Sequence, residues 1–171
     1  IIRKKVAQQV IFMPNGNHPL KETSLLLSFE QRYHLIELAI EDTPYFSVSD
    51  LDSPIYGVNY TYKLIQRITS KFSLEQFTFI IGADNALYFS QWYKYDWLLD
   101  NVDFTVVSRN CDNADIKSEI DERFNTINIE PYDISSTEIR AKLEKNESLS
   151  GCVPDKIINQ LIIYWKNLKL S

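Results

Sequence analysis

Three consecutive hydroxyl residues and a nearby arginine form the stretch of the sequence that is richest in chemical function. In "YDISSTEIRAKL", Ser135, Ser136 and Thr137 are followed three residues later by Arg140. Ser135 and Glu138 match a capping box, in which a hydroxyl and a carboxylate satisfy free N–H groups at a helix start. The other hydroxyls and Arg140 suit phosphate, because a helix N-terminus presents N–H donors and a positive dipole end. On these residues alone, a plain cap and a phosphate cradle both stay open.

The elements that must position this stretch are short apolar runs alternating with helical patterns. Five runs have the composition of buried strands, at residues 9–14, 45–50, 77–84, 102–109 and 126–130. Helices are expected at residues 28–42, 60–72, 92–101, from the hydroxyl stretch onward and at 153–167. Apolar strands that alternate with helices are typical of a parallel sheet covered on both faces. The sequence therefore predicts an α/β protein with a Rossmann-like, doubly wound parallel sheet.

Helical spacing identifies several residues that should face the core. Ser28 is the expected N-cap of the helix that contains Leu35, whose side chain should face inward. Ile139 and Leu143 are four residues apart and should share one buried face. Trp165 is interpreted as a packing residue, as is Trp97.

Ligands of doubly wound sheets bind beyond the carboxyl ends of the strands, where the strand order reverses. The residues that follow the predicted strands are at positions 15–21, 50–52, 82–85, 109 and 135–140. These positions hold small residues, hydroxyls, carboxylates and bases. That mixture suits a phosphorylated ligand.

Composition excludes several other kinds of protein. The chain has 171 residues, a formal net charge of −5 and a pI near 5.1, which argues against general binding to nucleic acid or anionic membranes. Cys111 and Cys152 are too few for a disulfide framework, which favours a cytoplasmic setting. His18 is interpreted as a loop residue and His34 as structural, since neither has zinc-ligand spacing. No apolar run approaches the roughly 20 residues that span a bilayer.

Five segments together resemble a known family. "DISSTEIR" resembles the I-S-S-T-x-I-R signature of the nucleotidylyltransferase superfamily. "FIIGADNALYFSQWYKYDWLL" is similar to its strand-G-x-D segment followed by a tryptophan, and "VIFMPNGNHPLK" to its second strand and P-x-K loop. "GVNYTYKLI" and "CVPDKIINQLIIYW" resemble its G-x-S-Y-T segment and its closing helix. In order and spacing, the segments from Val10 to Tyr164 resemble the bacterial nicotinate mononucleotide adenylyltransferases best.

The resemblance implies adenylyl transfer from ATP to nicotinate mononucleotide, which gives pyrophosphate and deamido-NAD in NAD biosynthesis. The chemistry would be an in-line displacement at the α-phosphorus, assisted by Mg²⁺ on the phosphates. ATP and nicotinate mononucleotide would be the partners, and a homo-oligomer is possible. We expect residues 1–171 to form a single nucleotidylyltransferase domain.

The family pattern implies which residues bind ATP. They are Gly82, Asp84, Arg109, Ser136, Thr137 and Arg140. The two hydroxyls and Arg140 would hold the phosphates, Gly82 would let the backbone approach the adenosine, and Asp84 would bond its ribose. Arg109 would lie near the adenine or the phosphates.

Four other residues would bind nicotinate mononucleotide, namely Lys21, Thr61, Trp92 and Tyr93. Trp92 would stack on the pyridinium ring, whose positive charge suits an aromatic face. Thr61 and the backbone around Tyr93 would meet the carboxylate, and Lys21 would lie near the phosphate. The sequence does not determine whether nicotinate is preferred over nicotinamide mononucleotide.

Each of these assignments has an alternative in which the residue serves the fold alone. Trp92 would then be core, Lys21 a solvated loop lysine and Thr61 a helix-start hydroxyl. Asp84 would cap the helix that follows its strand.

The chain departs from the family pattern at its start and after the Y-T pair. The family opens with a strand and an H-x-G-H motif whose histidines face the α-phosphate, and the chain contains no such motif, so no catalytic residue is visible. We expect the sheet in this chain to lack that N-terminal strand, and the domain to be N-terminally incomplete. Asn59 stands in place of the usual Ser, and Lys63-Leu64 in place of Asp-Thr. Two alternatives stay open, a sister adenylyltransferase for phosphopantetheine or FMN and a degenerate, non-catalytic nucleotide-binding module.

Overall fold

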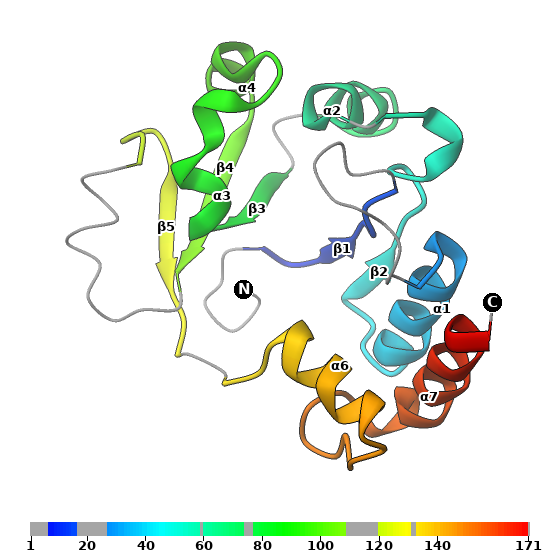
Figure 1. The fold of residues 1–171 in the computed structure, drawn as a ribbon. Helices are drawn as coiled ribbons and strands as arrows, with labels where there is room; N and C mark the ends of the chain where they lie inside the picture. Colours follow the sequence, from blue (N-terminus) through cyan, green and yellow to red (C-terminus); the bar gives the residue numbers. More distant parts are fainter. Residues whose placement is uncertain are drawn as a thin grey trace. The chain divides into compact units, whose positions relative to one another are not determined.

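The computed structural model describes residues 7–16, 27–58, 60–73, 77–108, 120–130 and 133–170 (Figure 1). The chain divides into two compact units. The first comprises residues 1–59 and 134–171, and the second comprises residues 60–133. Two predicted site residues, Lys21 and Arg109, lie outside the described residues.

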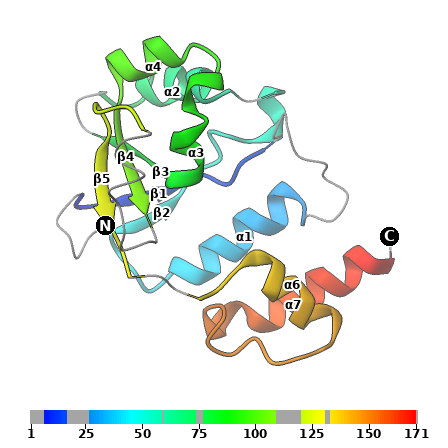
Figure 2. The same ribbon diagram turned by 60° about the vertical axis from the view of Figure 1, so that its left-hand side comes forward.

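The described part of the first unit combines a two-stranded parallel sheet with three α-helices (Figures 1 and 2). Its elements are β1 (Val10–Phe12), α1 (Phe29–Ile40), β2 (Phe46–Val48), the 3-10 turn η1 (Pro54–Tyr56), α6 (Ser136–Glu144) and α7 (Asp155–Leu170). The register places Val10 opposite Phe46 and Phe12 opposite Val48. The pairing is parallel, as the alternation of strand and helix predicts.

Ser28 caps α1, which confirms the sequence prediction. Its hydroxyl accepts a hydrogen bond from the backbone N–H of Gln31 at 3.2 Å, and the Gln31 side chain accepts from the backbone N–H of Ser28 at 2.9 Å. These reciprocal bonds form a capping box and satisfy two N–H groups that the helix itself cannot pair. The start of α1 is therefore fixed locally.

The core of the first unit lies among three helices. Its buried side chains are Leu35 of α1, Leu143 of α6, Leu149, and Ile157, Leu161 and Trp165 of α7. The predicted inward positions of Leu35, Leu143 and Trp165 are confirmed. His34 adds a polar contact between α1 and α7, since its Nδ1 lies 2.7 Å from the Tyr164 hydroxyl. This contact confirms the structural role predicted for His34.

The second unit is built on a three-stranded parallel sheet in the order β3-β4-β5. Its elements are α2 (Thr61–Thr69), β3 (Thr78–Gly82), α3 (Ala83–Leu87), the 3-10 turn η3 (Phe89–Gln91), α4 (Tyr95–Asn101), β4 (Asp103–Ser108) and β5 (Asn125–Asn128). Gly82 pairs opposite Val107, and Ser108 opposite Asn128, so the three strands end at one edge of the sheet. Phe104 and Thr105 of the central strand, whose side chains point to opposite faces, are only 1% and 2% exposed, as expected for a strand covered on both faces.

The α/β class, all five strands and the parallel pairing are confirmed. The described strands form two sheets, one in each unit, and a single domain over residues 1–171 stays a prediction. The sequence did not predict α3 and η3, because five and three residues are too few to show helical periodicity. Within the described residues, no helix has both the length and the apolar composition that a membrane crossing requires.

The residues on the buried face of α7 should account for most of what this helix contributes to the free energy of unfolding. Leu161 is 9% exposed and belongs to the core, whereas Ile163, two residues further along the same helix, is 50% exposed. Leu161→Ala should lower the free energy of unfolding by about 2–5 kcal/mol, because it leaves a cavity. The matched control Ile163→Ala should change it by no more than about 0.5 kcal/mol. Urea unfolding of both variants measures the difference, and equal losses would contradict the described packing.

Candidate functional site

The start of α6 holds the hydroxyl stretch in an exposed position. Ser135 is the N-cap, and its hydroxyl accepts from the backbone N–H of Glu138 at 3.1 Å. Capping therefore uses one hydroxyl of the three and leaves Ser136 and Thr137 in the exposed first turn. Arg140 lies one turn further, and its Nη2 donates to the Thr137 hydroxyl at 3.3 Å. The structure thus brings a guanidinium and a hydroxyl together at a helix N-terminus, a combination that suits an anion.

The loops that follow β1 and β2 approach each other closely in the first unit. A β-carbon at Gly16 would collide with the backbone of residues 52–54, so glycine is required where the two loops meet. Asp52 and Ser53 in the second loop are buried, at 6% and 7% exposure. Arg32 of α1 interacts electrostatically with Asp52, while burial lowers the pKa of its guanidinium. The sequence did not predict this contact of Arg32, because helical spacing within α1 gives no information about the loop that follows β2.

Gly82 and Asp84 stand where β3 passes into α3. Gly82 ends the strand and occupies the N-cap position of α3, and nothing lies within 4 Å of where its β-carbon would be. The fold itself therefore leaves room beside this backbone. Asp84 lies inside the first turn of α3, where no side chain caps the helix, so the alternative in which Asp84 is a cap is wrong. Its side chain is exposed. Its carboxylate is accessible beside the strand end.

Trp92 is held by an aromatic cluster of the second unit. Its ring stacks on Phe89, with centroids 4.7 Å apart and an interplanar angle of 29°. Phe89 is 3% exposed and meets Phe104 at 4.9 Å and Phe124 at 5.1 Å in edge-on geometry. Aromatic pairs of this kind stabilise one another beyond simple burial. The indole is only partly buried, so it joins the core on one side without being enclosed by it.

Thr61 and Tyr93 lie near each other at the start of α2. Thr61 is the first residue of the helix, and Tyr60 at the N-cap makes no side-chain capping bond. The ring of Tyr93 lies against both residues that flank Thr61, with centroids 5.0 Å from Tyr60 and 5.8 Å from Tyr62. The segment after Trp92 therefore packs on a helix start whose N–H groups can bind an anion.

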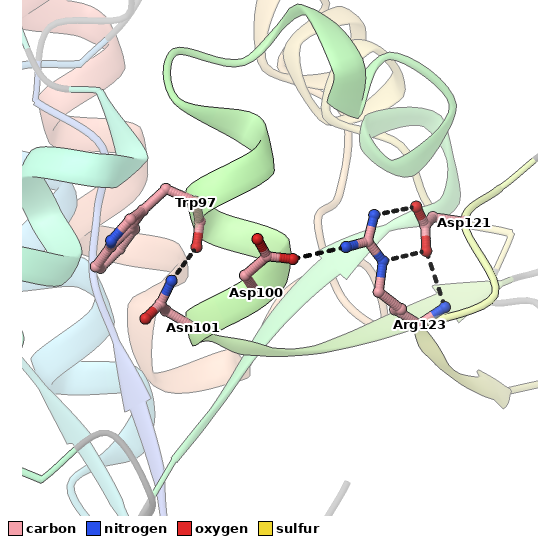
Figure 3. Close-up of polar contacts among 5 residues, drawn as sticks. All are labelled: Trp97, Asp100, Asn101, Asp121 and Arg123. Atoms are coloured by element: carbon pink, nitrogen blue, oxygen red, sulfur yellow. Dashed lines mark hydrogen bonds and ion pairs between the residues drawn. The ribbon is translucent and has the colours of Figure 1, made fainter.

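The helix α4, which follows this segment, is fixed on two sides (Figure 3). Trp97 extends to the side away from Arg123 and meets the ring of Tyr62 at 4.9 Å and 82°. On the other side, Arg123 donates to Asp100 at 2.8 Å and to Asp121 at 2.7 Å. Because Trp97 packs on α2, it confirms the packing role that the sequence predicts. Arg123 was missed, since its partner Asp100 lies 23 residues away in the sequence.

The predicted site residues fall into two described groups. Ser136, Thr137 and Arg140 share the start of α6 in the first unit. The second unit holds the other five described members, namely Thr61, Gly82, Asp84, Trp92 and Tyr93. Their binding roles stay predictions.

A family model described as cytidylyltransferase-like matches residues 1–142. The chain belongs to the cytidylyltransferase-like family. This cytidylyltransferase-like chain is 33% identical to a probable nicotinate-nucleotide adenylyltransferase of Hydrogenobaculum sp., over 90% of its own length and 79% of that protein. It is 32% identical to the probable nicotinate-nucleotide adenylyltransferase of Clostridium novyi, with 91% and 84% covered. These identities place it among the nicotinate-nucleotide adenylyltransferases of the family, as the motifs indicate.

Solved structures show the same fold at lower identity. The nicotinic acid mononucleotide adenylyltransferase of Plasmodium falciparum, complexed with NaAD, is 19% identical to the cytidylyltransferase-like chain and has a TM-score of 0.67. The match covers 96% of this chain and 85% of that one. At this identity the likeness supports the fold alone, and it agrees with the predicted nucleotidylyltransferase architecture.

The Asp121–Arg123 pair should make the stability of the second unit depend on pH in the acidic range. Side-chain and backbone hydrogen bonds from Arg123 hold the pKa of Asp121 at about 2, below its ordinary value of 3.8. A carboxyl whose pKa is lower in the folded state stabilises the fold above its unfolded pKa, and that stabilisation is lost as the pH falls through the folded value. We therefore expect Asp121→Asn to lower the urea midpoint at neutral pH, with the deficit shrinking from about pH 5 to about pH 2.

Glu122→Gln, which neutralises the exposed neighbouring carboxylate, is the matched control for this measurement. Its urea midpoint should follow that of the unmodified protein across the same pH range. A deficit of Asp121→Asn that stays constant down to about pH 2 would contradict the lowered pKa.

Proposed function

We propose that this chain transfers the adenylyl group of ATP to nicotinate mononucleotide, giving deamido-NAD and pyrophosphate in NAD biosynthesis. The observation that carries the proposal is the 33% identity to a protein named as a probable nicotinate-nucleotide adenylyltransferase, over 90% of this chain. The same name is carried by a Staphylococcus epidermidis relative, 33% identical over 88% of the chain. The motif resemblance leads to the same reaction.

The start of α6 would bind the phosphates of ATP. Ser136 and Thr137 would donate hydroxyl and backbone N–H groups, and Arg140 would add a charged donor that already contacts Thr137. The edge of the second-unit sheet would bind the nucleoside. There the open space beside Gly82 would admit the adenosine, and the exposed Asp84 carboxylate would accept hydrogen bonds from ribose hydroxyls. Arg109 is proposed to lie near the adenine or the phosphates.

Nicotinate mononucleotide would bind on the aromatic side of the second unit. The Trp92 ring, held by Phe89, would stack on the pyridinium, and the N-terminus of α2 at Thr61 would bind the carboxylate together with the backbone around Tyr93. Lys21 is proposed to lie near the phosphate. The contact of Tyr93 with both neighbours of Thr61 supports a shared role for the two segments.

The reaction needs positioning more than covalent chemistry. A phosphate oxygen of nicotinate mononucleotide attacks the α-phosphorus of ATP, a new P–O bond forms, and the bond to the β-phosphate oxygen breaks as pyrophosphate leaves. Arg140 and the helix N–H groups would stabilise the negative charge on the phosphates. The described residues contain no group of three or more His, Cys, Asp or Glu side chains suited to a metal ion. As the family resemblance implies, Mg²⁺ would bind the phosphates of ATP. There it would neutralise charge on the leaving pyrophosphate.

We also propose that the protein acts in the cytoplasm on these two nucleotides. Its net charge of −5 supports small-molecule partners over nucleic acid.

The direct test is product formation by the complete gene product supplied with ATP, nicotinate mononucleotide and Mg²⁺. We expect pyrophosphate and deamido-NAD in equal amounts, followed by a coupled phosphate assay and by mass spectrometry. ATP binding without pyrophosphate release would overturn the proposal in favour of a non-catalytic nucleotide-binding module. Turnover with phosphopantetheine or FMN alone would favour a sister adenylyltransferase.

Arg140 should be essential for tight ATP binding. Arg140→Ala should weaken the binding free energy of ATP by about 1.5–3 kcal/mol, which raises the Kd about 10- to 150-fold. This is the range for a hydrogen bond to a charged group. Isothermal titration calorimetry measures the change. The matched control is Lys145→Ala, which removes a positive charge at the other end of the same helix and should leave the Kd unchanged. Unchanged ATP affinity in Arg140→Ala would return the α6 start to a plain capping role.

A further inference from the structure

Two lysines of the second unit lie beside the helix start proposed to receive the substrate carboxylate. Nζ of Lys63 lies 5.8 Å from the centroid of the Tyr60 ring, and Nζ of Lys94 lies 5.9 Å from that of the Tyr93 ring. The two rings are themselves in contact, with centroids 5.0 Å apart. The ammonium groups therefore flank one tyrosine pair at the N-terminus of α2.

The location of each ammonium group follows from its backbone. Lys63 lies in the first turn of α2, and its side chain reaches back to the N-cap residue Tyr60, the direction that helical side chains favour. Lys94 adopts a left-handed conformation, with φ of 61°, and forms the N-cap of α4. Lys94 directly follows Tyr93, whose ring packs against Tyr60 and Tyr62 at the start of α2.

Neither lysine is paired with a carboxylate in the part of the chain that the structure describes. For Lys94, the nearest acidic neighbour in the sequence is Asp96, which accepts a hydrogen bond from the Tyr95 hydroxyl and faces the positive charge of Arg123. The contacts with Tyr60 and Tyr93 limit the freedom of the exposed side chains while leaving the charges unpaired.

We infer that Lys63 and Lys94 are specificity-determining residues that favour the acid form of the pyridine mononucleotide over its amide. The inference rests on the proposed function, since it assumes that the pyridine ring stacks on Trp92. Nicotinate and nicotinamide mononucleotides share the sugar and the phosphate and differ only in a carboxylate or a neutral carboxamide. A positive electrostatic potential at the start of α2 would stabilise the negatively charged carboxylate, whereas it would not stabilise the neutral carboxamide. At about 0.15 M salt its range is about 8 Å, enough to extend beyond a single side-chain contact.

The test is the ratio of the two dissociation constants, measured by calorimetry on the complete gene product and on Lys63→Met, Lys94→Met and the double variant. Methionine keeps the aliphatic stem and removes only the charge. Each single variant should lower the preference for nicotinate mononucleotide by about two- to fivefold, and the double variant by about tenfold, as for exposed charge pairs. The Kd of ATP should not change. Added salt should lower the preference of the unmodified protein and leave that of the double variant unchanged.

Lys71→Met is the matched control, since it removes the same charge just beyond the other end of α2. The nine-residue helix separates the two ends by about 12 Å, more than the screening length. In this variant the ratio of the two mononucleotide dissociation constants should equal that of the unmodified protein. The charge-conserving double variant Lys63→Arg, Lys94→Arg should keep the preference of the unmodified protein.

The outcomes separate this inference from the proposed function. An unchanged ratio in the double variant would overturn the inference alone. Equal weakening of both mononucleotides would also overturn it, because it would assign the lysines to the shared phosphate. Binding of neither mononucleotide by the unmodified protein would overturn the proposed function, and this inference with it.

Discussion

The stack of Trp92 on Phe89 is the interaction on which the proposed substrate site of the second unit depends. Phe89 is buried against Phe104 of the central strand and against Phe124, so the orientation of the indole is set by the core of the second unit. A flat aromatic surface serves recognition best when it is rigid, because a free side chain must be ordered when the ligand binds. In the proposed function, the core would therefore order the indole before a ligand arrives.

Helix starts supply the second constraint, and the two candidate sites use them differently. At α6 the Ser135 hydroxyl caps the helix and leaves its neighbours exposed beside Arg140. At α2 the N-cap is Tyr60, which makes no side-chain capping bond, and aromatic rings cover the helix start instead. A capped start with an arginine suits the concentrated charge of phosphates, whereas an aromatic start suits a flat ring that carries one carboxylate. This contrast agrees with a protein that handles two chemically different nucleotides.

The sequence predicted what depends on local pattern and missed what depends on distant contacts. Apolar runs and helical spacing identified all five strands, the Ser28 and Ser135 caps, and the buried faces of α1 and α6. The stacking partner of Trp92 was not predictable, because η3 is one turn long and has no periodicity. The ion pair of Arg123 with Asp100 and the location of Arg32 near Asp52 arise only when separate segments meet in the fold.

The measurement that tests this account most directly is the fluorescence of Trp92 during titration with nicotinate mononucleotide. The chain has three tryptophans, so the Trp97→Phe, Trp165→Phe double variant of the complete gene product would retain Trp92 as the tryptophan of this segment. We expect saturable quenching of its emission, with a midpoint equal to the calorimetric Kd, because a stacked pyridinium accepts the excited-state electron. Binding detected by calorimetry without any change in emission would show that the ring does not stack on Trp92 and would contradict the account.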